Sequence, residues 1–526
     1  MKTNNDVDVA WDYHNGTKHP NGKLFNRFHF YDPIFRSEPY KIYHDIDTIS
    51  LPLDKSSIGV AGLKAISEMV KVDDKNNVPD LSTLARILYF SGGITKVLTF
   101  PGLGEVEFRA AACTGALYHI EIYVVCSDIK GLEAGIYHFE PEQMKLGILR
   151  KGDFRSVLAE ATADEYAIKH APVILVYSDI FTRNSMKYQA REYRHAFWDC
   201  GTIIANTLAI STAHRLPSKV VMGFVDEKIN SLLDLNTEKE VTLALVPIGF
   251  SKDYAKKAVN LNPLSIITEP LSNYNYDDPE IQKIHSASSL NSEDEVKRWK
   301  RQFSIKQKIF SPKKFVKLEP KPKNAVLKNF VDSIIIKRGS TREFSHDLIT
   351  FKELSTIIYY STRGISADFL QPLGTSLIDL YLIANAVDGL DSGSYVYNKK
   401  QNGVELLKKG KFREVAGHLG LDQELPRDGS ACVFFITDLN RVFEKFGNRG
   451  YRVAQLEAST MGGKFYLAGY GQGLGVTGLT FYDDEVTEFF SPHAENKSVM
   501  FMVVIGKKAK KKRLLFTNFK KNQIFG

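Results

Sequence analysis

Apolar residues in this chain follow two patterns, one typical of helices and one typical of buried strands. Residues 81–91 (LSTLARILYFS) and 351–361 (FKELSTIIYYS) carry apolar side chains at helical spacing, so each predicts an amphipathic helix. Residues 171–179 (APVILVYSD) and 431–439 (ACVFFITDL) are nearly continuous apolar runs, which predict buried strands.

The other predicted elements also come in matching pairs. Each buried strand precedes a long predicted helix, which starts near Arg191 in one case and near Arg449 in the other. The remaining pairs are strands at 120–127 and 377–385, strands at 135–140 and 394–398, short helices at 154–161 and 412–419, and closing strands at 242–250 and 498–506. Strands that can pair antiparallel, with helices inserted irregularly between them, indicate an α+β fold.

The pairing reflects an internal repeat. GLEAGIYHFE (131–140) matches GLDSGSYVYN (389–398), and REYR (191–194) matches RGYR (449–452), both at a separation of 258 positions. A constant separation over about a hundred residues is a strong sign of duplication. Upstream the separation becomes 270, because the first copy carries about twelve extra residues in a predicted loop at 94–112.

The repeat and the composition between its copies predict the domain organisation. The stretch between the copies is rich in Asn, Ser, Asp, Lys and Pro, as linkers are, and holds one predicted helix (EDEVKRWKRQF). The predicted parts are an N-terminal extension (1–55), a first domain (56–250), a linker (251–325), a second domain (326–515) and a tail (516–526).

Composition and charge exclude several classes of protein. Of 526 residues, 43% are hydrophobic and 25% charged, which is ordinary for a globular protein. The N-terminus lacks the apolar core of a signal peptide, and no apolar run is long enough for a membrane span. The net charge of +8 does not form an aromatic-interleaved face for nucleic acid. The four cysteines show no metal-ligand spacing, so we expect a cytoplasmic protein without a metal site: Cys113, Cys126, Cys200 and Cys432.

The octet KRGSTREF (337–344) is the strongest candidate for chemistry. In an extended segment the alternating Arg338, Ser340 and Arg342 would project to one side. Guanidinium groups match phosphate oxygens bidentately, so the octet predicts a site for a phosphate monoester. A solvated basic loop is the alternative that the octet alone leaves open.

Arg-x-Ser-x-Arg followed by an aromatic residue resembles the phosphate-binding motif of the nitroreductase-like FMN-binding fold. YHNGTKH (13–19) and MKYQAREYR (186–194) narrow this resemblance to the SagB/ThcOx-type dehydrogenases. That resemblance implies an FMN-dependent enzyme that oxidises thiazolines and oxazolines of ribosomal peptides to thiazoles and oxazoles. The family usually shows Pro-Ser-Gly-Gly where this chain has Ala112–Gly115, which leaves the substrate and the contacts to the flavin edge open.

Nitroreductase-like proteins are dimers with FMN at the subunit interface, so the resemblance implies an intramolecular pseudo-dimer of two tandem domains. The second copy would hold the cofactor with the octet, a glycine-rich turn (471–478) and two lysines: Arg338, Ser340, Arg342, Gly473, Leu474, Gly475, Lys507 and Lys508. The first copy would supply the catalytic pair and a loop along the isoalloxazine: Lys187, Tyr188, Ala112, Cys113, Thr114 and Gly115. Taken without the family, Lys187 and Tyr188 would more simply be a surface pair opening a helix.

The mirror-image site is predicted to be empty of FMN. EMVKV (68–72) stands at the position of the octet, and Glu68 would repel a phosphate. Pro217 removes a backbone N–H from the turn equivalent to the glycine-rich one, and Phe446 replaces the tyrosine of the catalytic pair.

The resemblance also implies partners, and rival functions stay open. A modified peptide substrate and a cyclodehydratase or leader-binding partner protein are expected, with no nucleic acid or membrane partner and with further homodimerisation undecided. Dioxygen is the expected oxidant of the reduced flavin, because no nicotinamide fingerprint is visible. The rivals are an NAD(P)H-dependent nitro or quinone reductase, a flavin oxidase acting on another carrier-bound substrate, and a non-catalytic FMN-binding scaffold.

Overall fold

The structure is a computed structural model, and it describes most of the chain. The described residues are 4–19, 37–54, 56–73, 75–100, 104–254, 261–264, 266–270, 278–301, 314–323 and 329–509. The predicted tail (516–526) lies outside these residues, as do parts of the predicted linker.

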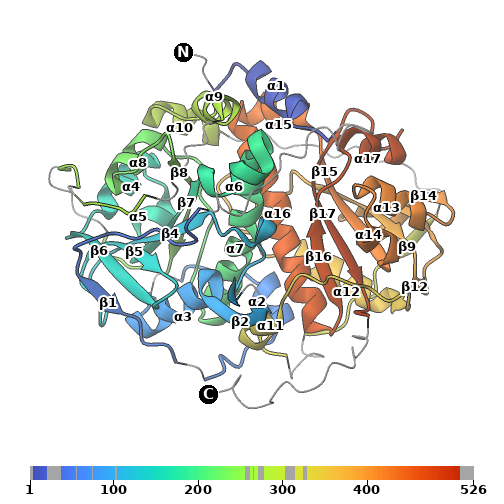
Figure 1. Cartoon of the computed structure of the whole chain (residues 1–526), viewed down its shortest axis with the longest axis horizontal. Coiled ribbons are helices and arrows are strands. Elements are labelled where there is room, and N and C mark those ends of the chain that lie inside the picture. Colours follow the sequence, from blue (N-terminus) through green and yellow to red (C-terminus); the bar gives the residue numbers. More distant parts are fainter. Residues whose placement is uncertain are drawn as a thin grey trace.

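One half of the molecule is built on a six-stranded antiparallel sheet (Figure 1). Its strands, in spatial order, are β1 (Thr48–Ser50), β6 (Lys145–Lys151), β5 (Gly135–Glu140), β4 (Ile120–Cys126), β7 (Val173–Ile180) and β8 (Glu240–Ile248). Every residue of β4, β7 and β8 is buried, so both faces of the sheet centre are covered. This explains why these strands read as continuous apolar runs.

The other half repeats this arrangement in a seven-stranded sheet. Its spatial order is β16 (Gly475–Leu479), β17 (Ser498–Gly506), β15 (Ala431–Thr437), β11 (Asp379–Ala384), β13 (Gly393–Asn398), β14 (Gly403–Lys409) and β9 (Phe315–Lys317). Along the chain, helices separate the strands of both sheets at irregular intervals. The mixed α+β class predicted from the sequence is therefore confirmed.

Two long helices, α7 (Glu192–Ala213) and α16 (Arg449–Gly471), lie side by side between the two sheets (Figure 1). Their backbones approach closely because small residues face each other. A side chain on Gly201 would overlap Ser459, and a Cβ on Gly463 would lie 2.6 Å from the Cβ of Ala205. Larger residues at these glycines would force the two halves apart.

The remaining helices border the sheets and the central pair. Three of them start with side-chain caps: Asp80 accepts from the backbone N–H of Thr83, Asp438 accepts from that of Arg441, and Thr350 forms a capping box with Glu353. They are α2 (Gly62–Ser67), α3 (Leu81–Gly92), α4 (Arg155–Ala161), α5 (Tyr166–Lys169), α6 (Phe181–Tyr188), α8 (Asp226–Leu233), α11 (Val331–Lys337), α12 (Phe351–Ser361), α13 (Arg413–Leu419), α14 (Glu424–Asp428), α15 (Leu439–Phe446) and α17 (Asp483–Phe490).

The insertion in the first copy is a β-hairpin and not the predicted loop. Strands β2 (Ile94–Phe100) and β3 (Gly104–Arg109) pair antiparallel across residues 94–109. The loop prediction was wrong, since polar and apolar residues alternate in EVEF (105–108), a pattern typical of a strand. A short parallel pair in the second half joins β10 (Ile349–Thr350) to β12 (Val387–Asp388).

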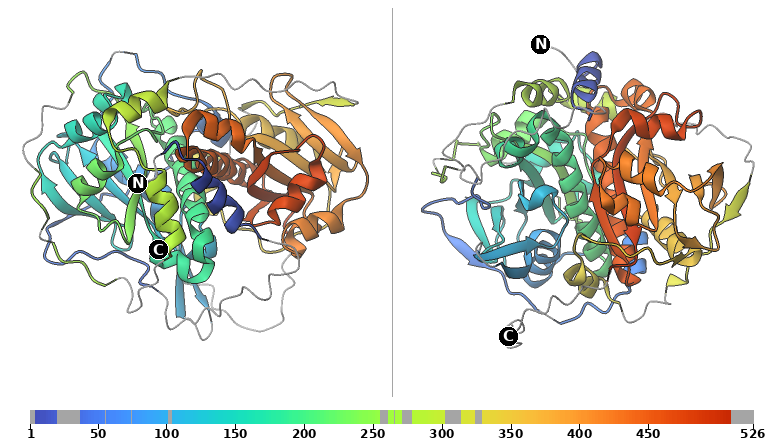
Figure 2. Two further views of the ribbon diagram at one scale, coloured as in Figure 1. Left: turned by 90° about the horizontal axis from the view of Figure 1, so that it is seen from above. Right: turned by 45° about the vertical axis from the view of Figure 1, so that its right-hand side comes forward.

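Residues assigned to the linker contain two packed helices. Helix α10 (Glu293–Lys300) lies where the sequence predicts it, and Trp299 on it is buried. Helix α9 (Pro279–Ala287) was not predicted; it packs beside α1 (Asp8–Gly16), with Ile281 and Ile284 buried (Figure 2). This part of the predicted linker is therefore core structure.

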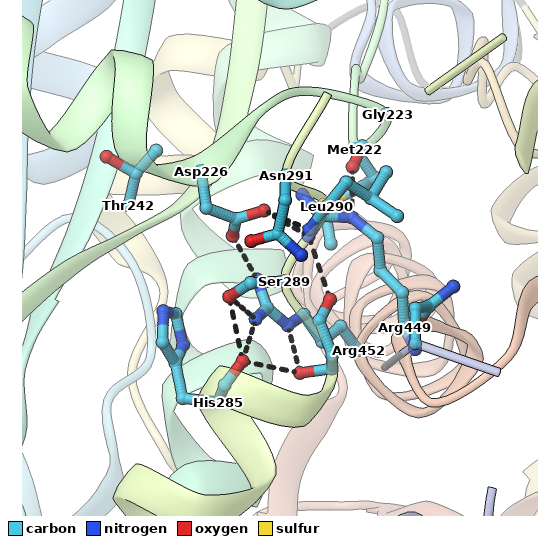
Figure 3. A network of polar contacts seen from close by, with 12 residues as sticks. Met222, Gly223, Asp226, Thr242, His285, Ser289, Leu290, Asn291, Arg449 and Arg452 are labelled. Atoms are coloured by element: carbon cyan, nitrogen blue, oxygen red, sulfur yellow. Dashed lines mark hydrogen bonds and ion pairs between the residues drawn. The ribbon is translucent and has the colours of Figure 1, made fainter. Parts of the chain in front are cut away.

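A buried cluster of charges joins the start of α16 to the start of α8 (Figure 3). Asp226 accepts from Arg449 Nη1 and from Arg452 Nη1, each at 2.7 Å, and all three side chains are buried. Burial raises the pKa of Asp226, but the two guanidinium groups outweigh it and hold the pKa below its usual value. Arg452 Nη2 also donates to the carbonyl oxygen of His285, so the cluster fixes α9 as well.

The equivalent cluster joins α7 to α17 with the roles of the halves exchanged. Arg194 Nη1 and Arg191 Nη1 donate to Asp483 at 2.6 and 3.1 Å. Arg194 Nη2 also donates to the carbonyl oxygen of His14, and its Nε to Thr17 Oγ1. The YHNGTKH segment therefore docks α1 on this cluster, as α9 docks on the other one.

We predict that Asp226→Ala destabilises the fold by about 3–5 kcal/mol, because two buried guanidinium groups lose their carboxylate. Denaturant unfolding would measure the change. Asp484→Ala is the matched control, because the Asp484 carboxylate pairs only at the surface, with Lys18. Equal stability of the two variants would contradict the prediction.

Candidate functional site

The octet follows α11 and reaches across the seam between the halves. Arg338 is buried, with its Nε 2.8 Å from the carbonyl oxygen of Ala110 and its Nη2 3.1 Å from that of Arg109. Burial lowers the pKa of Arg338. One predicted phosphate-binding side chain is therefore held by the end of the β2–β3 hairpin of the first half.

The rest of the octet lies along α16. Ser340 Oγ is 3.2 Å from the hydroxyl of Tyr466, and Thr341 Oγ1 is 3.1 Å from that of Tyr470. Arg342 is exposed. The octet therefore does not project its three polar residues equally: Arg338 is buried, Ser340 is half-buried and Arg342 reaches solvent.

The glycine-rich turn and the end of β17 meet the octet. A Cβ on Gly475 would lie 2.6 Å from Thr341 Oγ1 and 3.1 Å from Lys508 Cγ, so only glycine fits there. Gly473 has a φ of +80°, and Leu474 beside it is buried. The backbone carbonyl of Lys507 accepts from Ser345, which ties β17 to the octet.

Cationic side chains gather where the octet meets the glycine-rich turn and the end of β17. Lys508 Nζ lies 4.0 Å from the ring centre of Tyr470, and burial together with the charge of Lys96 lowers its pKa. No carboxylate pairs with Arg338, Arg342 or Lys508 within the part of the chain that the structure describes. Such a set of cations suits an anion such as a phosphate monoester.

Lys187 and Tyr188 end α6 and do not open a helix. A Cβ on Gly115 would lie 2.9 Å from the Tyr188 hydroxyl and 3.4 Å from Lys187 Nζ, so the loop 112–115 lies against the pair. Gly115 has a φ of +61°, which also favours glycine. The structure thus brings the predicted pair and the predicted loop together.

The two halves meet at this pair. Burial lowers the pKa of Lys187, and the positive charge of Arg342 from the other half lowers it further. Burial raises the pKa of Tyr188, with Asp199 adding to the effect. At neutral pH the tyrosine hydroxyl therefore keeps its proton, while the lysine loses its proton more readily than a free lysine.

Sequence reasoning missed the residue that holds the loop. The Asp199 carboxylate accepts from the backbone N–H of Thr114 at 2.8 Å, from Thr114 Oγ1 at 3.0 Å and from Cys113 Sγ at 3.0 Å. Burial raises the pKa of the Cys113 thiol to about 11, with Asp199 as the second cause, so Cys113 stays a neutral thiol. Ala112 is held by its carbonyl oxygen, which accepts from Thr202 at 2.6 Å.

His119 continues this hydrogen-bond network from Asp199 to Asp179, on the side of Asp199 away from the loop. Its Nε2 lies 2.8 Å from Asp199 Oδ2, its Nδ1 lies 2.6 Å from Asp179 Oδ1, and Glu192 is 3.3 Å away. Burial lowers the pKa of His119, but the acids outweigh it and raise the pKa well above its usual value. Side chains of these types also bind metals, but contacts of 2.6–2.8 Å between their own atoms are those of hydrogen bonds.

The opposite seam is closed by backbone contacts. Val220 N donates to Ser366 O at 2.8 Å, and Asp368 N donates to Val220 O at 3.0 Å. The Asp368 carboxylate also accepts from the backbone N–H groups of Met222 and Gly223. At the seam beside the octet, the carbonyl oxygens of Arg109 and Ala110, the counterparts of Ala367 and Asp368, accept from Arg338 instead.

A cavity of about 770 Å³ lies in the second half, away from Lys187. It is lined by the loop from Gln371 to Leu377, by the end of β13 and by Lys445 on α15, the counterpart of Lys187. Its lining contains both lysines and carboxylates, and none of the octet residues contributes. The cavity therefore does not belong to the site assembled around Arg342 and Lys187.

Comparisons with known proteins agree with this fold. Residues 74–250 match the model of the nitroreductase family. A candidate nitroreductase of Methanocaldococcus jannaschii is 28% identical over 169 residues, which is 32% of this chain and 80% of the relative. The microcin B17-processing protein McbC of Escherichia coli is 24% identical over 185 residues, which is 34% of this chain and 65% of the relative.

A crystal structure of a candidate nitroreductase from Anabaena variabilis covers nearly the whole chain. It superposes with a TM-score of 0.75 at 22% identity, over 95% of this chain and 99% of that one. Residues 74–250 therefore form a domain that matches the nitroreductase family, and the chain is similar to McbC over about a third of its length. None of the described helices combines the length and the hydropathy that a membrane crossing requires.

We predict that Arg342→Gln raises the pKa of Lys187 toward that of a free lysine, because it removes the cation that lowers it. Acetylation of Lys187 followed by mass spectrometry across pH would measure the change: the labelling midpoint should move to higher pH. Lys445 is the internal control, since burial alone lowers its pKa. A midpoint that moves at Lys445 and not at Lys187 would contradict the prediction.

Proposed function

We propose that the chain is an FMN-dependent dehydrogenase that converts peptide thiazolines or oxazolines to thiazoles or oxazoles in the biosynthesis of ribosomal peptide natural products. In this proposal two nitroreductase-like domains form an intramolecular pseudo-dimer with one composite flavin site. The observation that carries it is geometric: Arg338 of one half donates to the carbonyl oxygens of Arg109 and Ala110 in the other, and the loop Ala112–Gly115 that follows them lies against Lys187 and Tyr188.

The cationic cluster supports FMN as the cofactor. An FMN phosphate carries a double negative charge, and Arg338, Arg342 and Lys508 would hold it together with the Ser340 hydroxyl. Gly475 lets the glycine-rich turn pack directly against Thr341 and Lys508, because a Cβ there would lie only 2.6 Å from Thr341 Oγ1. The loop Ala112–Gly115 would lie along the ring system.

Lys187 and Tyr188 would manage the proton of the reaction. Oxidation of an azoline removes a hydride from one ring carbon and a proton from its neighbour, and bound FMN supplies the hydride acceptor. Lys187 accepts the proton, since burial and Arg342 favour its neutral amine. Tyr188 remains protonated and orients the ring or relays the proton.

The similarity to a microcin B17-processing protein supports a peptide substrate. By the same similarity we propose that the chain works with a cyclodehydratase or leader-binding partner in the cytoplasm. A further homodimer of the fused chain is compatible with this proposal.

A second candidate is an NAD(P)H-dependent nitro or quinone reductase, which the similarity to candidate nitroreductases favours. Mixing the flavin-loaded protein with NADPH and a quinone separates the two functions. Rapid flavin reduction would favour the reductase, and slow reduction with product from a thiazoline peptide would favour the dehydrogenase.

We predict one FMN per chain. The opposite seam is closed by the contacts of Val220 with Ser366 and Asp368, and Glu68 there pairs with Lys323. Arg338→Ala combined with Arg342→Ala should remove FMN, measured by absorbance near 450 nm per protein after gel filtration. Glu68→Ala is the matched control and should keep a ratio of one. A ratio of two in the unmodified chain would refute the single composite site.

We predict that Lys187→Ala lowers kcat for thiazoline oxidation by on the order of 100-fold while FMN stays bound, because the base is lost and the phosphate site is untouched. Tyr188→Phe should lower kcat less. Mass spectrometry of the peptide, which loses two hydrogens per ring, measures the product. Lys445→Ala is the control and should act like the unmodified protein. Full activity of Lys187→Ala would remove the pair from the mechanism and leave the scaffold role.

A further inference from the structure

The loop that faces the catalytic pair is strained. Gly115, Ala116 and Tyr118 all have a positive φ, and two of these residues carry side chains. A non-glycine residue in this region is strained, so such a loop persists only when its surroundings hold it. Strain of this kind gathers at functional sites.

One carboxylate holds the strained loop. Asp199, which is 4% exposed on α7, accepts from the N–H and the hydroxyl of Thr114, from Cys113 Sγ and lies 2.8 Å from His119 Nε2. An ionised carboxylate has about four acceptor positions, and this one uses them all on the loop and on His119. Charge-assisted hydrogen bonds are about twice as strong as neutral ones, so they can offset the strain.

We propose that Asp199 is a positioning residue: by fixing Cys113 and Thr114 it holds Gly115 against Tyr188 and Lys187 and so fixes where the pair presents its amine and hydroxyl. The distances of a Gly115 Cβ to the Tyr188 hydroxyl (2.9 Å) and to Lys187 Nζ (3.4 Å) show how closely the loop limits the pair. His119 orients the carboxylate from below through its own contact with Asp179 at 2.6 Å. This inference rests on the proposed function for its kinetic test.

The chain supplies its own matched control. Glu457 on α16, 258 positions after Asp199, accepts from Ser376 Oγ at 2.6 Å and from Leu377 N at 2.9 Å. It therefore holds a loop of the second half, at residues 376 and 377, that lines a cavity together with Lys445 and does not face the catalytic pair. Burial raises the pKa of Glu457 to about 7, so Glu457→Gln is a mild change there.

The test compares Asp199→Asn with Glu457→Gln in flavin-loaded protein acting on a thiazoline peptide. Asp199→Asn should lower kcat by on the order of 100-fold, because a small displacement of a catalytic group is enough for that, while KM and the FMN ratio stay unchanged. Glu457→Gln should leave kcat, KM and the FMN ratio as in the unmodified protein. A purely structural role would lower the melting temperature of both variants and change KM and the FMN ratio together with kcat, which would overturn the proposal.

If Asp199→Asn does not fold, the variant Thr114→Val tests the proposal instead. It removes one hydrogen-bond donor to Asp199 and keeps the branched shape of the side chain. A lower kcat at unchanged KM would support the proposal, and an unchanged kcat would overturn it. If the unmodified protein oxidises no azoline, the proposed function fails, and the rate of acetylation of Lys187 then tests the inference alone. That rate should rise in Asp199→Asn and not in Glu457→Gln; equal rates in both variants would overturn it.

Discussion

The architecture depends on two reciprocal buried ion clusters. In one, Arg449 and Arg452 of the second half share Asp226 of the first; in the other, Arg191 and Arg194 share Asp483. Removing six charged side chains from water is costly, and the cost is offset only when the guanidinium groups of each cluster keep their shared carboxylate. That requirement fixes the two long central helices relative to both halves, so the proposed composite site would inherit its geometry from contacts far from the octet.

The two seams that these clusters define are not equivalent. At one seam, backbone hydrogen bonds link Val220 to Ser366 and Asp368, and Glu68 pairs with Lys323. At the other, Arg338 enters from the second half and uses two carbonyl oxygens of the first. A symmetric pair of subunits would need the octet in both. In a chain with both copies fused, one seam can be closed by stabilising contacts while the other serves the proposed chemistry.

The sequence closely predicted the elements whose apolar residues follow a clear pattern. The predicted helix 351–361 and strand 498–506 have the bounds of α12 and β17. It missed α9, because the composition around it is polar and its apolar stripe is short. Arg338–Arg342 and Lys187–Tyr188 were found as motifs, yet Asp199 was not. A buried acid inside a helix has no local signature, since its hydrogen-bonding partners lie 80 or more positions away along the chain.

The two roles proposed for Arg342, binding a phosphate and lowering the pKa of Lys187, oppose each other. As a phosphate-binding group it would be neutralised by an anion, and as a neighbour of Lys187 it lowers a pKa only while its charge is unscreened. Burial, however, is the larger cause of the lowered pKa of Lys187. Pairing Arg342 with an anion therefore weakens the effect without abolishing it, and the amine stays easier to deprotonate than a free lysine. The loop held by Asp199 contributes to that burial, which makes the position of Gly115, and not the octet alone, the condition for a usable base.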